Sequence, residues 1–166
     1  RIVVAAVFAG VALGLTPYVL TRAFEGEARE AARGFVELAR AIRAGTGPVA
    51  PPACVIAGGE TTVVVRGRGV GGRNQEVVLG ALEAMAPQTL LLSIGSDGRD
   101  AETEFAGALG DSSLAERARS RGVAPRALLD ANDSHRFFAD LGGGIQTGLT
   151  GTNVADLFLA LRGRDV

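Results

Sequence analysis

The loop Gly67–Gly72 (GRGVGG) leads directly into Arg73 and Asn74, and this combination could bind an anion. A helix that begins at Arg73 would point its free N–H groups and its positive dipole end at the loop, which favours phosphate. A cation in the first helical turn lowers stability unless an anion lies nearby. We therefore predict anion contacts from Arg73, Asn74 and the backbone of Gly69, Gly71 and Gly72. The alternative is a tight turn that needs glycine for its backbone angles.

Two more segments carry clustered polar side chains. Asp97 and Asp100 follow the apolar run 89–94 and could hold Mg²⁺ or accept the proton of a substrate hydroxyl. The alternative is an Asp-Gly turn with solvated carboxylates. The segment Thr147–Asn153 (TGLTGTN) offers hydroxyl groups, an amide and two glycines. We expect Thr150, Thr152 and Asn153 to line the same crevice, although a plain turn between strands would also account for them.

The other polar candidates are weaker. Asn132 or Asp133 is expected to cap a helix, and His135 is expected to be a surface or hydrogen-bonded side chain. Arg66 and Arg68 are expected to be solvated, and Glu76 either contacts the ligand or pairs with Arg73. Cys54 is expected to be buried as a small apolar residue.

Strands and helices alternate along the sequence, which predicts an α/β fold. A β-branched strand at 61–65, a helix at 73–85 and a strand at 89–94 form a βαβ unit with a parallel strand pair. The carboxyl ends of such strands meet at one edge, which would bring Arg73 and Asp97 into one crevice. An amphipathic helix is predicted at 21–44, and strands at 15–20 and 154–161. The predicted architecture is a three-layer α/β/α fold with a mixed, mostly parallel sheet.

The uncharged segment 2–21 is long enough to span a bilayer. Gly10, Gly14 and Pro17 interrupt it, so a short strand or helix, a break at Gly14 and then a strand are favoured over a membrane span. The Pro- and Gly-rich segment Gly45–Pro52 is the best candidate for a linker.

Composition excludes several classes of site. All 17 basic residues are Arg, so the chain has no P-loop lysine and no Schiff-base lysine. The formal charge of −1 argues against a nucleic-acid partner or a charged membrane surface. One Cys and one His exclude an internal disulfide and a two-histidine metal site, and they fit a reducing compartment such as the cytoplasm.

The motifs GGETTV (58–63), GVGGRNQE (69–76) and TGLTGTNVAD (147–156) together resemble the C-terminal MOFRL domain of the type-2 glycerate kinases, which are also named hydroxypyruvate reductases. The resemblance runs from about residue 13 to 161. The acidic loop departs from the family pattern, because Ser96, Ala101, Glu102 and Glu104 replace the family's Thr, Gly, Pro and Asp.

The resemblance implies transfer of the γ-phosphoryl group of ATP, with Mg²⁺, to the 2-hydroxyl of D-glycerate, giving 2-phosphoglycerate. It also implies an active site shared with a larger N-terminal domain. Residues 1–50 would then be a remnant of that domain or a connecting strand and helix, and residues 51–166 the MOFRL domain. A homodimer is also compatible. The alternatives are an NAD(P)H-dependent hydroxypyruvate reductase and a non-catalytic anion-binding module.

Overall fold

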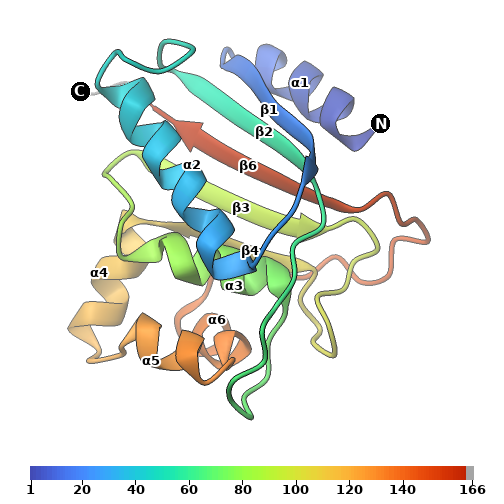
Figure 1. Cartoon of the computed structure of the whole chain (residues 1–166), viewed down its shortest axis with the longest axis vertical. Coiled ribbons are helices and arrows are strands. Elements are labelled where there is room, and N and C mark those ends of the chain that lie inside the picture. The colour runs from blue at the N-terminus through green and yellow to red at the C-terminus, as the bar shows by residue number, and fades with distance from the viewer. Residues whose placement is uncertain (164–166) are drawn as a thin grey trace.

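The computed structural model describes residues 1–163, which form one six-stranded sheet with helices on both faces (Figure 1). Only the β1–β2 pair is parallel, and the four other strand pairs are antiparallel. The sheet is therefore mixed as predicted, but the prediction that it is mostly parallel is wrong. The cause is β6, which runs antiparallel between β2 and β3. The strand order is β1 (Thr16–Phe24), β2 (Ala53–Gly59), β6 (Asp156–Arg162), β3 (Thr89–Gly95), β4 (Gly107–Asp111) and β5 (Gly144–Ile145).

The helices form the outer layers, which confirms the predicted three-layer arrangement. One helix, α1, covers β1 and β2 on one face, while α2 and α3 pack on the opposite face. Three short helices complete the lower end of the molecule in Figure 1. The bounds are α1 (Ile2–Ala12), α2 (Ala28–Arg43), α3 (Arg73–Leu82), α4 (Ser112–Ser120), α5 (Pro125–Asp130) and α6 (Ser134–Leu141).

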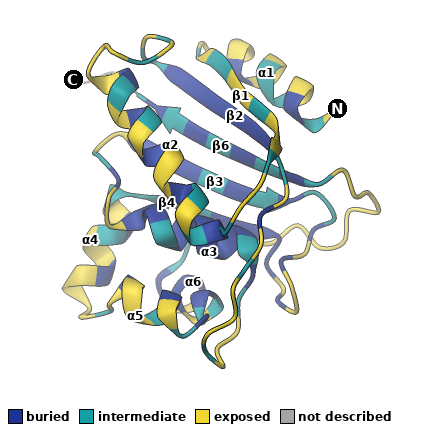
Figure 2. Ribbon diagram, in the orientation of Figure 1, coloured by how far each residue is buried: buried dark blue, intermediate teal, exposed yellow. Residues whose placement is uncertain are grey.

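The main core lies between the sheet and the α2–α3 layer (Figure 2). In α2, Ala28, Ala32, Phe35 and Ile42 are buried at helical spacing, as the amphipathic pattern predicts. Phe35 lies against Phe24 and Phe158 of the sheet, at ring-centroid distances of 5.0 and 6.2 Å.

The start of the predicted helix 21–44 is wrong, because residues 21–24 complete β1 and the chain turns at Gly26, where φ is 109°. Residues 45–52 connect α2 to β2. β1 and α2 belong to the same sheet and core as the rest of the described chain. The boundary predicted near residue 50 therefore separates two paired strands, β1 and β2.

The predicted strand 61–65 is also wrong. The strand that precedes α3 is Ala53–Gly59, which is buried except at Gly59, and residues 61–65 form a loop with one bridge, between Glu27 and Thr62. β-Branched residues favour an extended backbone, but a strand needs a partner along its length, and Val64 and Val65 are exposed. The helix that follows ends at Leu82 rather than Met85. The strands predicted at 89–94 and 154–161 are confirmed as β3 and β6.

The first segment forms α1, a turn at Gly14 with φ of 73°, and then β1. This outcome agrees with the predicted break and strand. In the part of the chain that the structure describes, no helix is long and apolar enough to cross a membrane.

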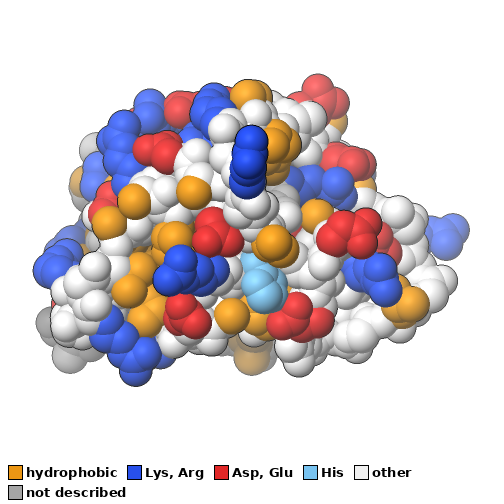
Figure 3. Space-filling view, turned by 90° about the horizontal axis from the view of Figure 1, so that it is seen from below, with side chains coloured by type: hydrophobic (Ala, Val, Ile, Leu, Met, Phe, Trp, Pro, Cys, Tyr) orange, Lys and Arg blue, Asp and Glu red, His pale blue; other side chains and the backbone are white. Residues whose placement is uncertain are grey.

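Figure 3 shows the lower face of the molecule, on which acidic and basic side chains alternate with apolar ones. This mixed pattern agrees with the formal charge of −1.

Candidate functional site

Three strand ends meet at one edge of the sheet. Gly59 ends β2, Gly95 ends β3, and both are register partners of Asp156, the first residue of β6. The helix α3 begins at the same edge with Arg73, whose side chain reaches Asp156. The carboxyl ends of β2 and β3 therefore lie at the same end of the sheet, as the predicted crevice requires, although the antiparallel β6 lies between them.

Arg73 and Asp156 form a bidentate ion pair. The Arg73 Nε donates to Asp156 Oδ2 at 2.6 Å, and Nη2 donates to Oδ1 at 3.0 Å. Asp156 is 1% exposed, whereas the Arg73 side chain is 34% exposed. The hydrogen bond to Asp156 is the main cause of the raised pKa of Arg73. The planar guanidinium donates two parallel hydrogen bonds to a buried carboxylate. This geometry fixes the orientation of the Arg73 side chain.

The third guanidinium nitrogen of Arg73 has a weaker partner. Its Nη1 lies 3.0 Å from Glu60 Oε1, and the Glu60 side chain is 62% exposed. Exposed ion pairs contribute at most about 1 kcal/mol, so an incoming anion could displace Glu60 at small cost. One edge of Arg73 is thus available for a carboxylate or a phosphate.

Asp97 lies beside this pair. A Cβ atom placed on Gly95 would lie 3.2 Å from Asp97 Oδ1 and 3.5 Å from Asp156 Oδ1, so both carboxylates lie over Gly95. Among the described residues the ionic partners of Arg73 are Asp156 and Glu60, so a crevice shared by Arg73 and Asp97 stays a prediction. Asp97 Oδ1 accepts a hydrogen bond from the Arg99 N–H at 3.0 Å.

The loop 147–155 is tied to the Asp97 loop. The N–H of Thr150 donates to the Asp97 carbonyl at 3.1 Å, and the N–H of Val154 donates to Ser96 Oγ at 2.8 Å. Thr150, Thr152 and Asn153 are exposed on this loop. The loop that carries them is therefore held against the Asp97 loop, and their contact with a ligand stays a prediction.

Asp100 is buried at the start of α3. It is 2% exposed and accepts four hydrogen bonds, from the backbone and side-chain nitrogens of Asn74 and Gln75, at 2.9–3.3 Å. Burial raises the pKa of Asp100, while these hydrogen bonds oppose the rise. The anion at the start of α3 is thus the protein's own carboxylate. The predicted ligand contact of Asn74 and the predicted metal role of Asp100 gain no support, because both side chains are buried and hydrogen-bonded to each other.

The glycines of the loop 67–72 have a structural explanation. A Cβ atom on Gly67 would overlap Ala131, one on Gly69 would overlap Asp133, and one on Gly71 would overlap Ser134. A Cβ atom on Gly72 would overlap the Asp100 carboxylate. These glycines permit close approach of the chain to itself, so a phosphate cradle is not needed to explain them.

The segment 131–135 holds this loop in place. Asn132 Oδ1 accepts hydrogen bonds from the N–H groups of Arg66 and Gly67 at 2.6 and 2.8 Å, and Asp133 Oδ1 accepts one from Val70 at 3.1 Å. Asn132 Nδ2 also donates to Glu76 Oε1 at 2.7 Å. Asn132 and Asp133 therefore mainly fix the position of the loop 67–72. Asp133 makes no side-chain capping hydrogen bond to α6.

The remaining polar candidates are accounted for. Arg66 pairs with Glu27 at 2.6 Å, and His135 Nε2 lies 2.9 Å from Glu104 Oε2. Glu76 pairs with Arg29 rather than with Arg73, and Cys54 is buried as predicted.

A cavity of about 510 Å³ adjoins Arg73. It lies between the loop after β2 and the start of α3, and Glu60, Thr61, Gly72, Arg73 and Ala101 are among the residues that line it. We call it the Thr61 cavity.

Sequence reasoning missed Asp156 and Glu60 as site residues. Asp156 carried a usable signal, since it is a charged residue at the head of an apolar strand and ends the motif TGLTGTNVAD. Glu60 belongs to the motif GGETTV, but its pairing with Arg73 depends on tertiary contacts that no local pattern shows.

Comparison with known proteins gives a family match. The model of the MOFRL family matches residues 53–156. The D-glycerate 2-kinase of Thermotoga maritima is 39% identical over 150 residues, which cover 89% of this chain and 36% of that protein. A putative hydroxypyruvate reductase of Agrobacterium vitis is 39% identical over 163 residues, covering 96% of this chain and 37% of that protein.

A solved structure agrees. The crystal structure of a glycerate kinase from T. maritima superposes with a TM-score of 0.92 at 37% identity, covering 95% of this chain and 38% of that one. The chain therefore spans somewhat more than a third of the length of these relatives.

Proposed function

The chain belongs to the MOFRL family, and from that premise we propose that it forms the MOFRL part of a cytoplasmic D-glycerate 2-kinase. The reaction transfers the γ-phosphoryl group of ATP to the 2-hydroxyl of D-glycerate and gives 2-phosphoglycerate. The observation that carries this proposal is the Arg73–Asp156 pair. It leaves the Nη1 edge of the guanidinium with only the exposed Glu60 as a partner, at the end of the sheet where Asp97 also lies.

In this proposal Arg73 binds the carboxylate of the acid or a phosphate of the nucleotide in place of Glu60. Phosphoryl transfer depends mainly on positioning and on neutralising charge, which suits a guanidinium fixed in one direction. Asp97 lies where it could orient the reacting hydroxyl. In this proposal Thr150, Thr152 and Asn153, which are exposed on the neighbouring loop, also contact the substrates.

Magnesium fits this site only through Asp97. Within residues 1–163, no group of three or more His, Cys, Asp or Glu side chains is arranged to hold a metal ion. Mg²⁺ needs only one or two protein carboxylates when substrate phosphates and water supply the other ligands. When bound, Mg²⁺ would neutralise charge on the transferring phosphoryl group, and Asp97 is the residue that would hold it.

Exposed apolar side chains beside the site support a shared active site. Val64, Val65 and Val70 are exposed on the loop 60–72 that leads to α3, and Leu149 and Val154 are exposed on the loop 147–155. Apolar patches of this kind mark surfaces that another domain covers. We propose that an N-terminal domain packs against these two loops and supplies the remaining groups of the active site.

The reductase alternative gains less support. A dinucleotide site needs the start of a helix free for the pyrophosphate, but the Asp100 carboxylate already fills that place at α3. The glycine loop also follows a loop rather than a strand.

The test is a coupled assay of ADP release with D-glycerate and Mg²⁺, on this chain and on the full-length protein. The decisive variant is Arg73→Lys, because Arg73→Ala would leave the buried Asp156 unpaired and confound activity with stability. Replacing the planar guanidinium with an ammonium group should remove about 3 kcal/mol of transition-state stabilisation, which lowers kcat/KM roughly a hundredfold.

Arg119→Lys, at an exposed position of α4 outside the candidate site, is the matched control and should keep full activity. Equal kcat/KM for the unsubstituted protein and Arg73→Lys would refute the role of Arg73. Absence of ADP release from the full-length protein would refute the kinase assignment.

A further inference from the structure

Asp100 is a buried carboxylate that the proposed reaction does not use. Its Oδ1 accepts hydrogen bonds from the backbone N–H and the side-chain Nδ2 of Asn74, at 3.1 and 3.3 Å. Its Oδ2 accepts hydrogen bonds from the backbone N–H and the side-chain Nε2 of Gln75, both at 2.9 Å. A carboxylate offers about four acceptor positions. Asp100 is among the residues that line the Thr61 cavity, but the protein's own donors fill these positions, so its charge needs no ligand.

Asp100 takes the place of a helix N-cap. Asn74 and Gln75 are the second and third residues of α3, and N–H groups at these positions usually donate to a capping side chain. The N-cap residue itself, Gly72, has no side chain. A Cβ atom there would lie 2.2 Å from Asp100 Cγ, so glycine at this position makes room for the carboxylate. The start of α3 is therefore capped by a residue that lies 25 positions beyond Gln75 in the sequence.

The Asp97 loop is fixed to α3 through the same residue. Thr103 is 6% exposed, and its Oγ1 donates to the Asp100 carbonyl at 2.9 Å and accepts from Gln75 Nε2 at 3.2 Å. The carboxylate of Asp97 accepts a hydrogen bond from the N–H of Arg99, the residue immediately before Asp100. This hydrogen bond ties the Asp97 carboxylate to backbone that Asp100 holds against α3.

Arg73 lies next to the same attachment point on α3. It immediately precedes Asn74, and Ser93 Oγ of β3 donates to Asn74 Oδ1 at 2.5 Å. Asp156 sets the direction of the Arg73 side chain, whereas Asp100 and Ser93 set the position of the backbone that carries it. A displacement of about 1 Å in a group that positions substrate can lower the rate roughly a hundredfold.

We propose that Asp100 is a positioning residue, which holds Arg73 and Asp97 at the separation that phosphoryl transfer requires and does not itself contact substrate or metal. This inference rests on the proposed function. An amide has only one oxygen, so Asp100→Asn would place an NH2 group against the N–H donors of Asn74 or Gln75. Both attached segments would then shift, while the groups proposed to contact the substrates stay unchanged.

The experiment is a double-mutant cycle in the full-length protein, with ADP release followed at a temperature at which every variant is folded. Asp100→Asn should lower kcat roughly tenfold and change KM for D-glycerate and for ATP less than about threefold, because the contact groups remain but are misaligned. In the Arg73→Lys background, Asp100→Asn should lower kcat less than about threefold, because the residue through which it acts is already replaced. A purely structural role would lower kcat by the same factor in both backgrounds.

Asp111→Ala is the matched control. Asp111 also caps a helix, since its Oδ1 accepts a hydrogen bond from the N–H of Leu114 in α4 at 3.0 Å, but it pairs with Leu90 at the end of β3 away from the candidate site. Asp111→Ala and Asp100→Asn should both lower the unfolding temperature, and only Asp100→Asn should lower kcat.

Thr103→Val is a milder second variant. It removes the hydroxyl group that connects Gln75 to the Asp100 carbonyl and leaves the Asp100 carboxylate in place. It should lower kcat roughly threefold, in the same way that Asp100→Asn does but to a smaller extent. If Asp100→Asn does not fold, Thr103→Val decides the question by the same cycle with Arg73→Lys.

The outcomes separate the two proposals. Unchanged kcat in Asp100→Asn and Thr103→Val would overturn the positioning role alone, as would an equal factor lost with and without Arg73→Lys. No turnover in the unsubstituted full-length protein would overturn the kinase assignment and the positioning role with it.

Discussion

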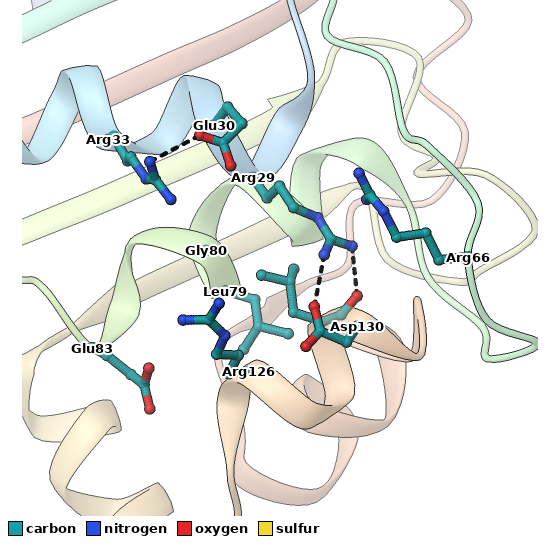
Figure 4. A pocket seen from close by; sticks show the side chains of 10 residues that line it. Arg29, Glu30, Arg33, Arg66, Leu79, Gly80, Glu83, Arg126 and Asp130 are labelled. Atoms are coloured by element: carbon teal, nitrogen blue, oxygen red, sulfur yellow. Dashed lines mark hydrogen bonds and ion pairs between the residues drawn. The ribbon is translucent and has the colours of Figure 1, made fainter.

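Two arginines near the starts of neighbouring helices differ in what their guanidinium groups contact. In α2, Arg29 donates from Nη1 to Asp130 Oδ1 at 3.0 Å, and from Nη2 to the Leu129 carbonyl at 2.6 Å and to Glu76 at 3.4 Å. Figure 4 shows Arg29 reaching Asp130 of α5 across a cavity of about 310 Å³. In α3, Arg73 has a buried partner in Asp156 and only the exposed Glu60 on its remaining edge.

This difference separates a structural arginine from a candidate ligand-binding one. Arg29 is 11% exposed and connects three helices through the nearly buried Glu76 and the Leu129 carbonyl, in addition to the exposed Asp130. Arg73 is fixed as firmly on one side but keeps a replaceable partner on the other. The number of arginines around a cavity is therefore a poor guide to function. Four line the cavity of Figure 4, and three of them, Arg29, Arg33 and Arg66, have acidic partners.

The largest expected effect on stability is that of Arg29→Met. It leaves the nearly buried Glu76 without its cation, so the free energy of unfolding should fall by about 3 kcal/mol. Urea unfolding followed by circular dichroism measures this change. Arg126→Met, at an exposed position facing the same cavity, should change it by at most about 0.5 kcal/mol. If Arg73→Lys lost more stability than Arg29→Met, the distinction between the two arginines would fail.

A second prediction concerns Glu76, the buried partner of Arg29. Burial is the main cause that raises its pKa above 4.5 in the folded protein. Because the pKa of Glu76 is higher in the folded than in the unfolded state, Glu76 stabilises the folded protein at pH values below its unfolded-state pKa. This stabilisation is lost as the pH rises through the folded-state pKa. Between about pH 4.5 and pH 7, the unsubstituted protein should therefore lose stability relative to Glu76→Gln. Parallel stability curves in urea titrations would contradict this prediction.

The smallest expected effect is at Ala101, which has a φ of 54° in the loop between Asp100 and Thr103. The family pattern has glycine there, and a left-handed conformation disfavours any side chain. Ala101→Gly should raise the free energy of unfolding by about 0.5–1 kcal/mol, as seen in thermal unfolding. Ala127→Gly, in the exposed face of α5, should lower it by about 1 kcal/mol. Destabilisation by Ala101→Gly would show that the loop is not strained.

Local patterns predicted the elements better than their arrangement. The periodicity of α2 and the apolar runs of β3 and β6 identified these elements, because burial on one or both faces leaves a mark in the sequence. No local sequence pattern indicates that β6 lies between β2 and β3. This position makes two more strand pairs antiparallel.

At the candidate site, residue types and spacing predicted roles for Arg73 and Asp97, and these roles stay predictions. Residue types and spacing did not show that Asp100 would turn inward to the start of α3, nor that Asp156 would fix Arg73, since both depend on contacts between segments 25 or more residues apart.

The placement of β6 also bears on how the protein is made. On the ribosome, β2 and β3 emerge long before the strand that must lie between them, so the sheet stays divided until residues 156–162 have been synthesised. Pairings this distant along the chain form late and slowly. Since Asp156 arrives with that strand, the nascent polypeptide acquires its oriented Arg73 only at the moment the two halves of the sheet join.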